Sequence, residues 1–265
     1  MNASDKFRRM AKGRSWTRDE LIVAMNLYCK LPFGQLHYRN PVIIALAEKL
    51  GRTPSSVAMK LCNFASLDPV QQARGISGLS GASAGDRAVW LEFHQDWERL
   101  AFESEQRRAA LDGRAVEVEA QIPDDELPRE GLERERVVRQ RVNQGFFRAA
   151  VLAAYGSRCC VTGLAVPELL IASHIVPWAK NKANRVNPRN GLCLNALHDS
   201  AFDRGFITLT PKMQVEISSS LKVAPVAPVT KRLLLDYDQA VIRLPERFLP
   251  DSELLAWHRE NVFRG

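Results

Sequence analysis

Residues 173–205 read SHIVPWAKNKANRVNPRNGLCLNALHDSAFDRG. This stretch holds two of the chain's five histidines, His174 and His198, with Asn190 between them. An apolar run leads into His174, a turn-rich basic loop follows, and a second apolar run leads into His198. Short apolar runs bounded by turn residues are typical of buried strands or helix segments, so each histidine is expected where an ordered element ends or begins. The pattern therefore predicts a small active site.

The residue types in this stretch suit hydrolysis of a phosphodiester bond. A neutral histidine is a good general base near neutral pH, and an asparagine can hold that base by accepting from its second ring nitrogen. A divalent metal can stabilise the scissile phosphate and the leaving oxygen. His174 is accordingly the candidate base and Asn190 its candidate positioner, because the loop between them is long enough to bring both to one place.

Longer motifs surround this stretch. They are QGFFRAAVLAAYGSRC (144–159), CCVTG (159–163), ASHIVPW (172–178) and NPRNGLCLNALHDSAFDRGFITL (187–209). Together they resemble the HNH endonuclease family, and within it the members found in restriction and other bacterial defence nucleases, over roughly residues 138–265. The resemblance implies a ββα-metal fold, with His174 on a hairpin and His198 on the helix that follows. It also implies that His174 is the general base, Asn190 its positioner, and His198 a catalytic residue that binds the metal.

The chain departs from the family pattern at one position. Many members have Asp or His immediately before the base as a metal ligand, whereas this chain has Ser173. A hydroxyl is a weak ligand, so we expect Asp203 to be the second protein ligand, with Asp199 as the alternative. The resemblance implies a divalent metal cofactor, Mg²⁺ or Mn²⁺, with Zn²⁺ and Ni²⁺ as alternatives.

The N-terminal region has the pattern of three short helices. Thr17 and Asn40 are expected helix N-caps, Gly51 a helix end, and Thr53 the cap of the third helix. This arrangement resembles a helix-turn-helix module, and its first helix is similar to the start of Myb-type domains. The candidate DNA contacts in this module are Arg39, Arg52, Ser55, Ser56 and Lys60. A packing or dimerisation bundle is the alternative interpretation.

The predicted fold class is α+β: an N-terminal all-α domain followed by a C-terminal ββα-metal nuclease domain. We place the helical domain at residues 1–111, an acidic Pro- and Gly-containing linker at 112–134, and the nuclease domain at 135–265. Further expected elements are helices over 86–111, 136–155 and 250–261, hairpins pairing 158–162 with 169–173 and 207–209 with 214–218, and strands over 232–235 and 240–244.

The amino-acid composition indicates which kind of partner to expect. The net charge is +7, and residues 1–66, with eleven Lys and Arg against four Asp and Glu, carry an excess equal to that of the whole chain. This favours double-stranded DNA as partner. In the central loop, the candidate backbone contacts are Lys180, Lys182, Arg185 and Arg189. Five cysteines without CxxC spacing predict core packing rather than disulfides or a zinc site. No apolar run suggests a membrane span or a signal peptide, so a cytoplasmic protein without membrane contact is expected.

The sequence thus predicts a metal-dependent DNA endonuclease, of restriction or anti-phage defence type, in which the N-terminal domain recognises a DNA sequence or a base modification. A homodimer is expected, because one such site cuts one strand. The alternatives are a DNA-binding protein without catalysis and a nuclease triggered by a ligand.

Overall fold

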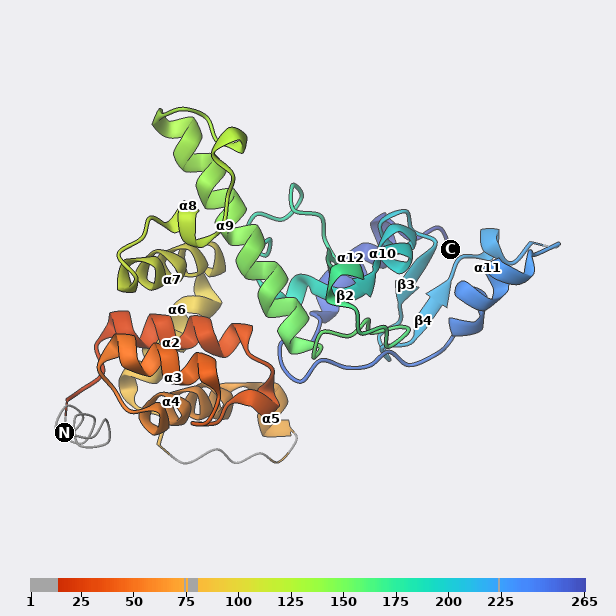
Figure 1. The fold of residues 1–265 in the computed structure, drawn as a ribbon. Coiled ribbons are helices and arrows are strands. Elements are labelled where there is room, and N and C mark those ends of the chain that lie inside the picture. The colour runs from red at the N-terminus through yellow and green to blue at the C-terminus, as the bar shows by residue number, and fades with distance from the viewer. Residues whose placement is uncertain (1–13, 74, 76–80, 224) are drawn as a thin grey trace. The chain divides into compact units, whose positions relative to one another are not determined.

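The computed structural model describes residues 14–73, 75, 81–223 and 225–265, and it divides into two compact units, 1–149 and 150–265 (Figure 1). The division lies inside helix α9 (Gly131–Ala154), later in the chain than the expected linker at 112–134. In the described part of the chain, no helix is long and apolar enough to cross a membrane.

The N-terminal unit is helical throughout its described residues. Its helices are α2 (Arg18–Lys30), η1 (Phe33–Gln35), α3 (Pro41–Leu50), α4 (Pro54–Leu67), α5 (Pro69–Ala73), α6 (Ala84–Gln95), α7 (Trp97–Leu111), α8 (Val116–Glu119), η2 (Asp124–Glu126) and most of α9. Helix α2 packs against α4, α6 and α7, and α3 packs against α4. Tyr28 and Phe64 meet at the centre of this core, and both are fully buried.

The expected helix ends of this unit are confirmed. Thr17 caps α2 in a capping box with Glu20, and Asn40 accepts from the Val42 amide at the start of α3. Gly51 ends α3 with a φ of 62°, in the left-handed region that glycine adopts at low cost, and Thr53 caps α4. The three helices of the predicted module are therefore present.

Two expectations for this unit differ from the structure. The helix expected over 86–111 is broken at Asp96. This residue follows the end of α6 and is the N-cap of α7, where its side chain accepts from the Arg99 amide. Residues 112–134, expected as an acidic linker, contain α8, η2 and the start of α9. Leu127 is buried against Val138 and Val142 of α9, and this apolar contact orders the segment.

The C-terminal unit is built from two small antiparallel sheets and surrounding helices. Its elements after α9 are η3 (Pro167–Leu169), β1 (Leu170–His174), η4 (Pro188–Asn190), β2 (Gly191–Asn195), α10 (Ala196–Asp203), β3 (Ile207–Leu209), β4 (Val215–Ile217), η5 (Ser219–Leu221), α11 (Pro228–Leu233), η6 (Leu235–Tyr237) and α12 (Ser252–Asn261). Strand β1 pairs with β2, with Ala172 opposite Cys193, and β3 pairs with β4.

Strand pairing in this unit corrects part of the prediction. The second hairpin and the closing helix α12 are confirmed, but 158–162 forms turns and the partner of β1 is β2. Residues 232–235 lie in and after α11, and 240–244 contributes only one isolated bridge, between Val241 and Gln214. Residues 232–233 are taken up by α11, whereas the Ile242 amide donates to the Met213 carbonyl and the Arg243 amide to the Cys160 carbonyl, so 240–244 forms scattered bonds rather than a strand ladder.

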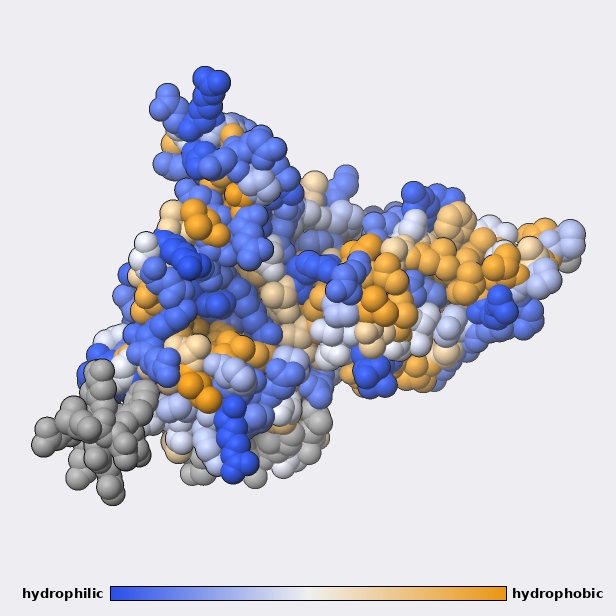
Figure 2. Space-filling view, viewed as in Figure 1, coloured by the Kyte–Doolittle hydropathy of each residue, from blue (hydrophilic) through white to orange (hydrophobic). Residues whose placement is uncertain are grey.

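Apolar side chains are also exposed on the C-terminal unit. Figure 2 shows apolar residues on the face of this unit that is turned toward the viewer. Among the described residues, the exposed large apolar side chains of this unit are Val166, Leu169, Leu197, Val223, Val229, Leu233, Val241 and Leu244.

Candidate functional site

The centre of the C-terminal unit is the continuous arrangement β1, loop, β2, α10. His174 is the last residue of β1 and lies opposite Gly191, the first residue of β2. Helix α10 begins directly after β2, with Asn195 as its N-cap accepting from the His198 amide at 2.9 Å. Short strands followed at once by a capped helix therefore bring His174, Asn190 and His198 to one part of the fold.

His174 is half-buried and has one ring nitrogen committed to the protein. Its Nε2 lies 2.8 Å from the Arg185 carbonyl oxygen. A carbonyl only accepts, so Nε2 carries the proton in the neutral ring and Nδ1 is the basic nitrogen. Burial lowers the pKa of His174, although the Arg185 carbonyl and the negative charge of Asp199 act in the opposite direction. The ring is consequently neutral at pH 7, as a general base must be.

Asn190 is fully buried and holds the backbone beside the base. Its Oδ1 accepts from the Val176 amide at 2.8 Å, and its Nδ2 donates to the Val176 carbonyl at 3.0 Å. The Asn190 carbonyl accepts from the Ile175 amide at 2.9 Å. The expected contact from the second ring nitrogen of His174 to Asn190 is thus made instead to Arg185. Asn190 therefore holds the backbone that follows His174, through Ile175 and Val176.

His198 has the opposite tautomer. Its Nδ1 donates to Asn195 Oδ1 at 3.0 Å, and the ring is 2% exposed. Among the residues that the structure describes, nothing lies within hydrogen-bond distance of the buried Nε2. Burial lowers the pKa of His198, which keeps Nε2 as a bare lone pair. A buried imidazole nitrogen with no protein partner, on a ring oriented through its other nitrogen, has the properties of a metal ligand.

Two carboxylates share helix α10 with His198. Asp199 and Asp203 are one turn apart, and Asp203 is exposed. Partial desolvation and the like charge of Asp199 raise the pKa of Asp203. Across the described residues, no set of three or more His, Cys, Asp or Glu side chains is arranged to hold a metal. A metal here would be held by His198 and one of these carboxylates, with substrate and water completing its shell.

Ser173 lies at the position where many HNH members have a ligand. It is 2% exposed, and its Oγ has no hydrogen-bond partner among the described residues. In β1 it pairs with Leu192. A neutral hydroxyl is a weak metal ligand, so the carboxylates of α10 remain the better ligand candidates.

Sequence reasoning missed two aromatic residues that contact the histidines. Trp178 meets the His174 ring edge-on, with centroids 5.7 Å apart. Tyr237 of η6 meets the His198 ring in the same way at 5.4 Å. Trp178 lies close to His174 in the sequence, so a contact between their rings could have been predicted. Tyr237 is far along the chain, and no local pattern indicated it.

The basic residues of the central loop differ in whether other protein groups contact their charged ends. Lys180 and Lys182 are exposed. The Arg185 guanidinium lies over the Trp178 ring, 5.0 Å from its centroid. Arg189 pairs with Asp251 at 3.0 Å, which ties the loop to the start of α12. The two lysines are therefore the loop cations most accessible to a phosphate.

Arg52, an expected DNA contact, is a structural residue. It is 6% exposed and pairs with Glu20 at 2.7 Å. It also donates to the carbonyls of Arg14 and Ser15. A guanidinium with these partners holds the N-terminal turn of α2 to the α3–α4 turn and is not presented to a phosphate.

Lys60 is also committed within the unit. Its Nζ lies 2.8 Å from Asp86 Oδ1, and the Asp86 side chain is fully buried. Asn63 donates to the same carboxylate at 3.0 Å. The expected base or phosphate contact from Lys60 would break this buried pair. Of the module's candidates, Arg39 and Ser55 are exposed and Ser56 is half-buried.

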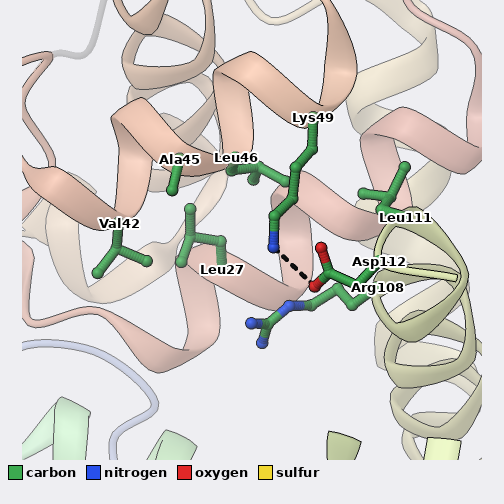
Figure 3. Close-up of a pocket in the computed structure, with 8 residues that line it drawn as sticks. All are labelled: Leu27, Val42, Ala45, Leu46, Lys49, Arg108, Leu111 and Asp112. Carbon is green, nitrogen blue, oxygen red and sulfur yellow. Dashed lines mark hydrogen bonds and ion pairs between the residues drawn. The ribbon is translucent and has the colours of Figure 1, made fainter. Parts of the chain in front are cut away.

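A small pocket in the N-terminal unit lies among α2, α3 and α7 (Figure 3). Its wall is mostly apolar, and Lys49 pairs with Asp112 at 2.7 Å at its polar side. Arg108, which also lines it, donates to the buried Asn26 at 3.2 Å. Both cations of the pocket are thus held by protein groups.

The charge of the chain is divided unevenly. Residues 14–149 contain 19 Lys and Arg and 19 Asp and Glu, whereas residues 150–265 contain 14 and 10. The remaining excess lies in residues 1–13, with four Lys and Arg against one Asp, outside the described residues. The described helices of the N-terminal unit are therefore close to neutral as a set.

The cysteines near the site are packed, as expected. Cys159, Cys160 and Cys193 are buried and form no disulfide. The Cys160 amide donates to the Cys193 carbonyl at 2.7 Å, and burial raises the pKa of the Cys160 thiol well above its usual value. Neutral buried thiols are poor metal ligands and poor nucleophiles.

Comparison with known proteins addresses the same segment. A family model described as HNH endonuclease matches residues 159–210. The matched segment includes β1, the central loop, β2, α10 and β3. No curated protein matches the chain. The match confirms the HNH resemblance over this segment and supports a nuclease domain of the kind that uses a divalent metal ion.

Proposed function

We propose that this protein is a metal-dependent DNA endonuclease of the restriction or anti-phage defence type. One observation carries the proposal: the two histidines of the HNH segment give opposite ring nitrogens to the protein. His174 keeps its Nε2 proton on a carbonyl and offers Nδ1 as a base, and His198 keeps its Nδ1 proton on Asn195 and offers Nε2 as a ligand. A packing role does not explain the buried Nε2 of His198, which has no hydrogen-bond partner among the described residues.

In the proposed reaction, His174 Nδ1 takes a proton from the water that attacks the phosphorus atom, and the bond from phosphorus to the leaving oxygen breaks. The Arg185 carbonyl holds the Nε2 proton throughout, so the ring becomes an imidazolium without rotating. The negative charge of Asp199 favours that imidazolium, because it stabilises positive charge on His174. Asn190 keeps the backbone on the C-terminal side of the base in place.

A divalent metal, when bound, supplies charge stabilisation for the phosphate and the leaving oxygen. His198 would hold it through Nε2, together with Asp203 or Asp199. Imidazole and carboxylate suit Mn²⁺ well, and Mg²⁺, Zn²⁺ and Ni²⁺ also accept such ligands.

The proposed substrate is double-stranded DNA. The exposed Lys180 and Lys182 lie on the loop between the base and Asn190, which favours contact with the DNA backbone near the cut. In the N-terminal unit, Arg39, Ser55 and Ser56 are the remaining candidates for recognition of a sequence or a base modification. A homodimer would place a second site on the opposite strand, and the exposed apolar side chains of the C-terminal unit are candidates for its interface.

The test is cleavage of plasmid DNA, unmodified and modified, with Mg²⁺, Mn²⁺ or EDTA. We expect discrete, metal-dependent fragments from the wild-type protein. Strand nicking without linearisation, and a monomer in analytical ultracentrifugation, would contradict the homodimer but leave the nuclease. Binding without cleavage of any substrate would contradict a constitutively active nuclease and favour a triggered nuclease or a DNA-binding protein without catalysis.

A second candidate is a nuclease triggered by a ligand or protein that binds the N-terminal unit. The balanced charge of residues 14–149 and the internal pairing of Arg52 and Lys60 favour it. Replacing Arg39, Ser55 and Ser56 together with alanine distinguishes the two. Unchanged DNA affinity and cleavage pattern in that variant would favour the triggered nuclease.

A further inference from the structure

The His174 ring is held by two residues outside the His–Asn–His pattern. Its Nε2 bonds the Arg185 carbonyl at 2.8 Å, and its edge meets the Trp178 ring at an interplanar angle of 88°. The Arg185 guanidinium lies over that same indole, 5.0 Å from its centroid. The three residues therefore contact one another in a closed set. The His174 imidazole meets the Trp178 indole, the indole meets the Arg185 guanidinium, and the Arg185 carbonyl accepts from the imidazole.

The Arg185 carbonyl belongs to a segment without regular secondary structure. Arg185 lies in a bend of the loop between β1 and β2, where no strand or helix fixes the direction of its carbonyl. The next residue, Val186, is fully buried and anchors the chain there. The Asn187 amide also donates to the Asn184 carbonyl at 3.2 Å, across the same bend. The stacking of the guanidinium on Trp178 adds a side-chain contact at Arg185 to these backbone contacts.

We propose that Trp178 is a positioning residue for the His174 base: its indole supports the ring edge and the Arg185 guanidinium, and so keeps the Arg185 carbonyl on Nε2. The inference deepens the proposed function and rests on it for its catalytic meaning. One part does not depend on the nuclease activity: Trp178 determines which nitrogen of His174 carries the proton. Without this support, both tautomers of the ring become accessible, and only one of them presents a basic Nδ1.

The direct test reads the tautomer. The full-length, metal-free protein is labelled with ¹⁵N-histidine, and long-range ¹H–¹⁵N correlation spectra identify the protonated nitrogen of each ring. His174→Ala identifies the His174 signals. We expect the pure Nε2–H form in the wild type and in Trp178→Phe, and a mixture of tautomers in Trp178→Leu. Trp257→Leu, the same change on α12, is the matched control and should leave the His174 signals unchanged.

A second variant keeps the inference testable if Trp178→Leu does not fold. Arg185→Leu retains the carbonyl and the indole but removes the stacked guanidinium, and it should also give a mixture of tautomers. A pure Nε2–H form in a folded Trp178→Leu or Arg185→Leu protein overturns the inference.

Kinetics separate this inference from the proposed function. In Trp178→Leu we expect kcat to fall by roughly tenfold to a hundredfold, with DNA affinity within about twofold, because a misplaced base affects the chemical step. A tautomer change in a protein that cleaves no DNA would support the positioning role and contradict the nuclease. Cleavage that is unaffected by the loss of Trp178 would contradict the positioning role and leave the nuclease.

Discussion

At the scale of single residues, the site depends on which ring nitrogen each histidine gives to the protein. His174 gives Nε2 to a loop carbonyl, and His198 gives Nδ1 to its own helix cap. Burial lowers the pKa of both rings, so both are neutral at pH 7. Two residues of one type thereby acquire different chemistry from their hydrogen bonds alone.

Asn190 gives the first prediction. Asn190→Ala leaves the buried amide and carbonyl of Val176 without partners, and each such loss costs about 1–3 kcal/mol. We expect the free energy of unfolding to fall by about 2 kcal/mol or more, measured by urea denaturation. Asn190→Asp keeps the acceptor for the Val176 amide and should cost less. Equal stability of Asn190→Ala and the wild type would contradict the bonding described.

His258 gives the second prediction. It is buried on α12 between Thr208 and the Phe202 carbonyl, and burial lowers its pKa from 6.5 to about 4. Because the unfolded chain then binds more protons, stability is fully present above pH 6.5 and falls as the pH drops toward 4. The total loss across this window is about 3 kcal/mol.

The measurement is urea unfolding of metal-free protein at pH 7.5, 5.5 and 4.5, with His258→Gln as reference. The other histidines titrate in both proteins, so the difference isolates His258. The same loss of stability with falling pH in His258→Gln would contradict the assignment.

At the scale of elements, local signals were reliable and non-local ones were not. The caps at Thr17, Asn40 and Thr53 could be predicted because a cap depends on a few neighbouring residues. The partner of β1 could not, because pairing is decided by packing across the long loop that separates it from β2. The break at Asp96 was missed because the apolar pattern continues on both sides of it.

The same division holds for the site. His174, Asn190 and His198 could be proposed from the motif, and the structure brings their elements together. The bond from His174 to Arg185 could not be predicted, because it uses a backbone carbonyl that no side-chain pattern reveals.

Gly205 supplies a prediction at this scale. It follows α10 with a φ of 72°, and an added Cβ would overlap the carbonyl oxygen of Val262 near the C-terminus. Gly205→Ala should therefore lower the free energy of unfolding by about 3 kcal/mol or more, from strain and overlap together. The matched control is Gly163→Ala, with a φ of 75° and open space around it, which should cost about 1 kcal/mol. Thermal or urea unfolding checks both, and equal losses would contradict the close approach at Gly205.

At the scale of the whole molecule, the distribution of charge constrains how DNA is held. The excess is in residues 1–13 and in 150–265, while 14–149 is balanced. The basic character of the first 66 residues indicated a DNA-binding module, but Arg52 and Lys60 are used internally. Composition counts charges and cannot show which of them are paired.

Salt dependence of DNA binding tests this distribution. Replacing Lys180 and Lys182 with glutamine should reduce the slope of log affinity against log salt by about 2, since each phosphate contact contributes about 0.9. Lys212→Gln, an exposed lysine on the β3–β4 turn, is the control and should leave the slope unchanged. A slope that is unaffected by the loss of both loop lysines would remove the central loop from the DNA contact.

The central claim is that His174 and His198 perform metal-dependent DNA cleavage. The most direct measurement is the rate of cleavage of supercoiled plasmid in Mg²⁺ or Mn²⁺ by His174→Ala and His198→Ala, beside His37→Ala, an exposed histidine of the N-terminal unit. We expect the cleavage rate of both site variants to fall at least about a hundredfold while DNA binding is retained. His37→Ala should cleave like the wild type. Cleavage by His174→Ala at the wild-type rate would contradict the central claim.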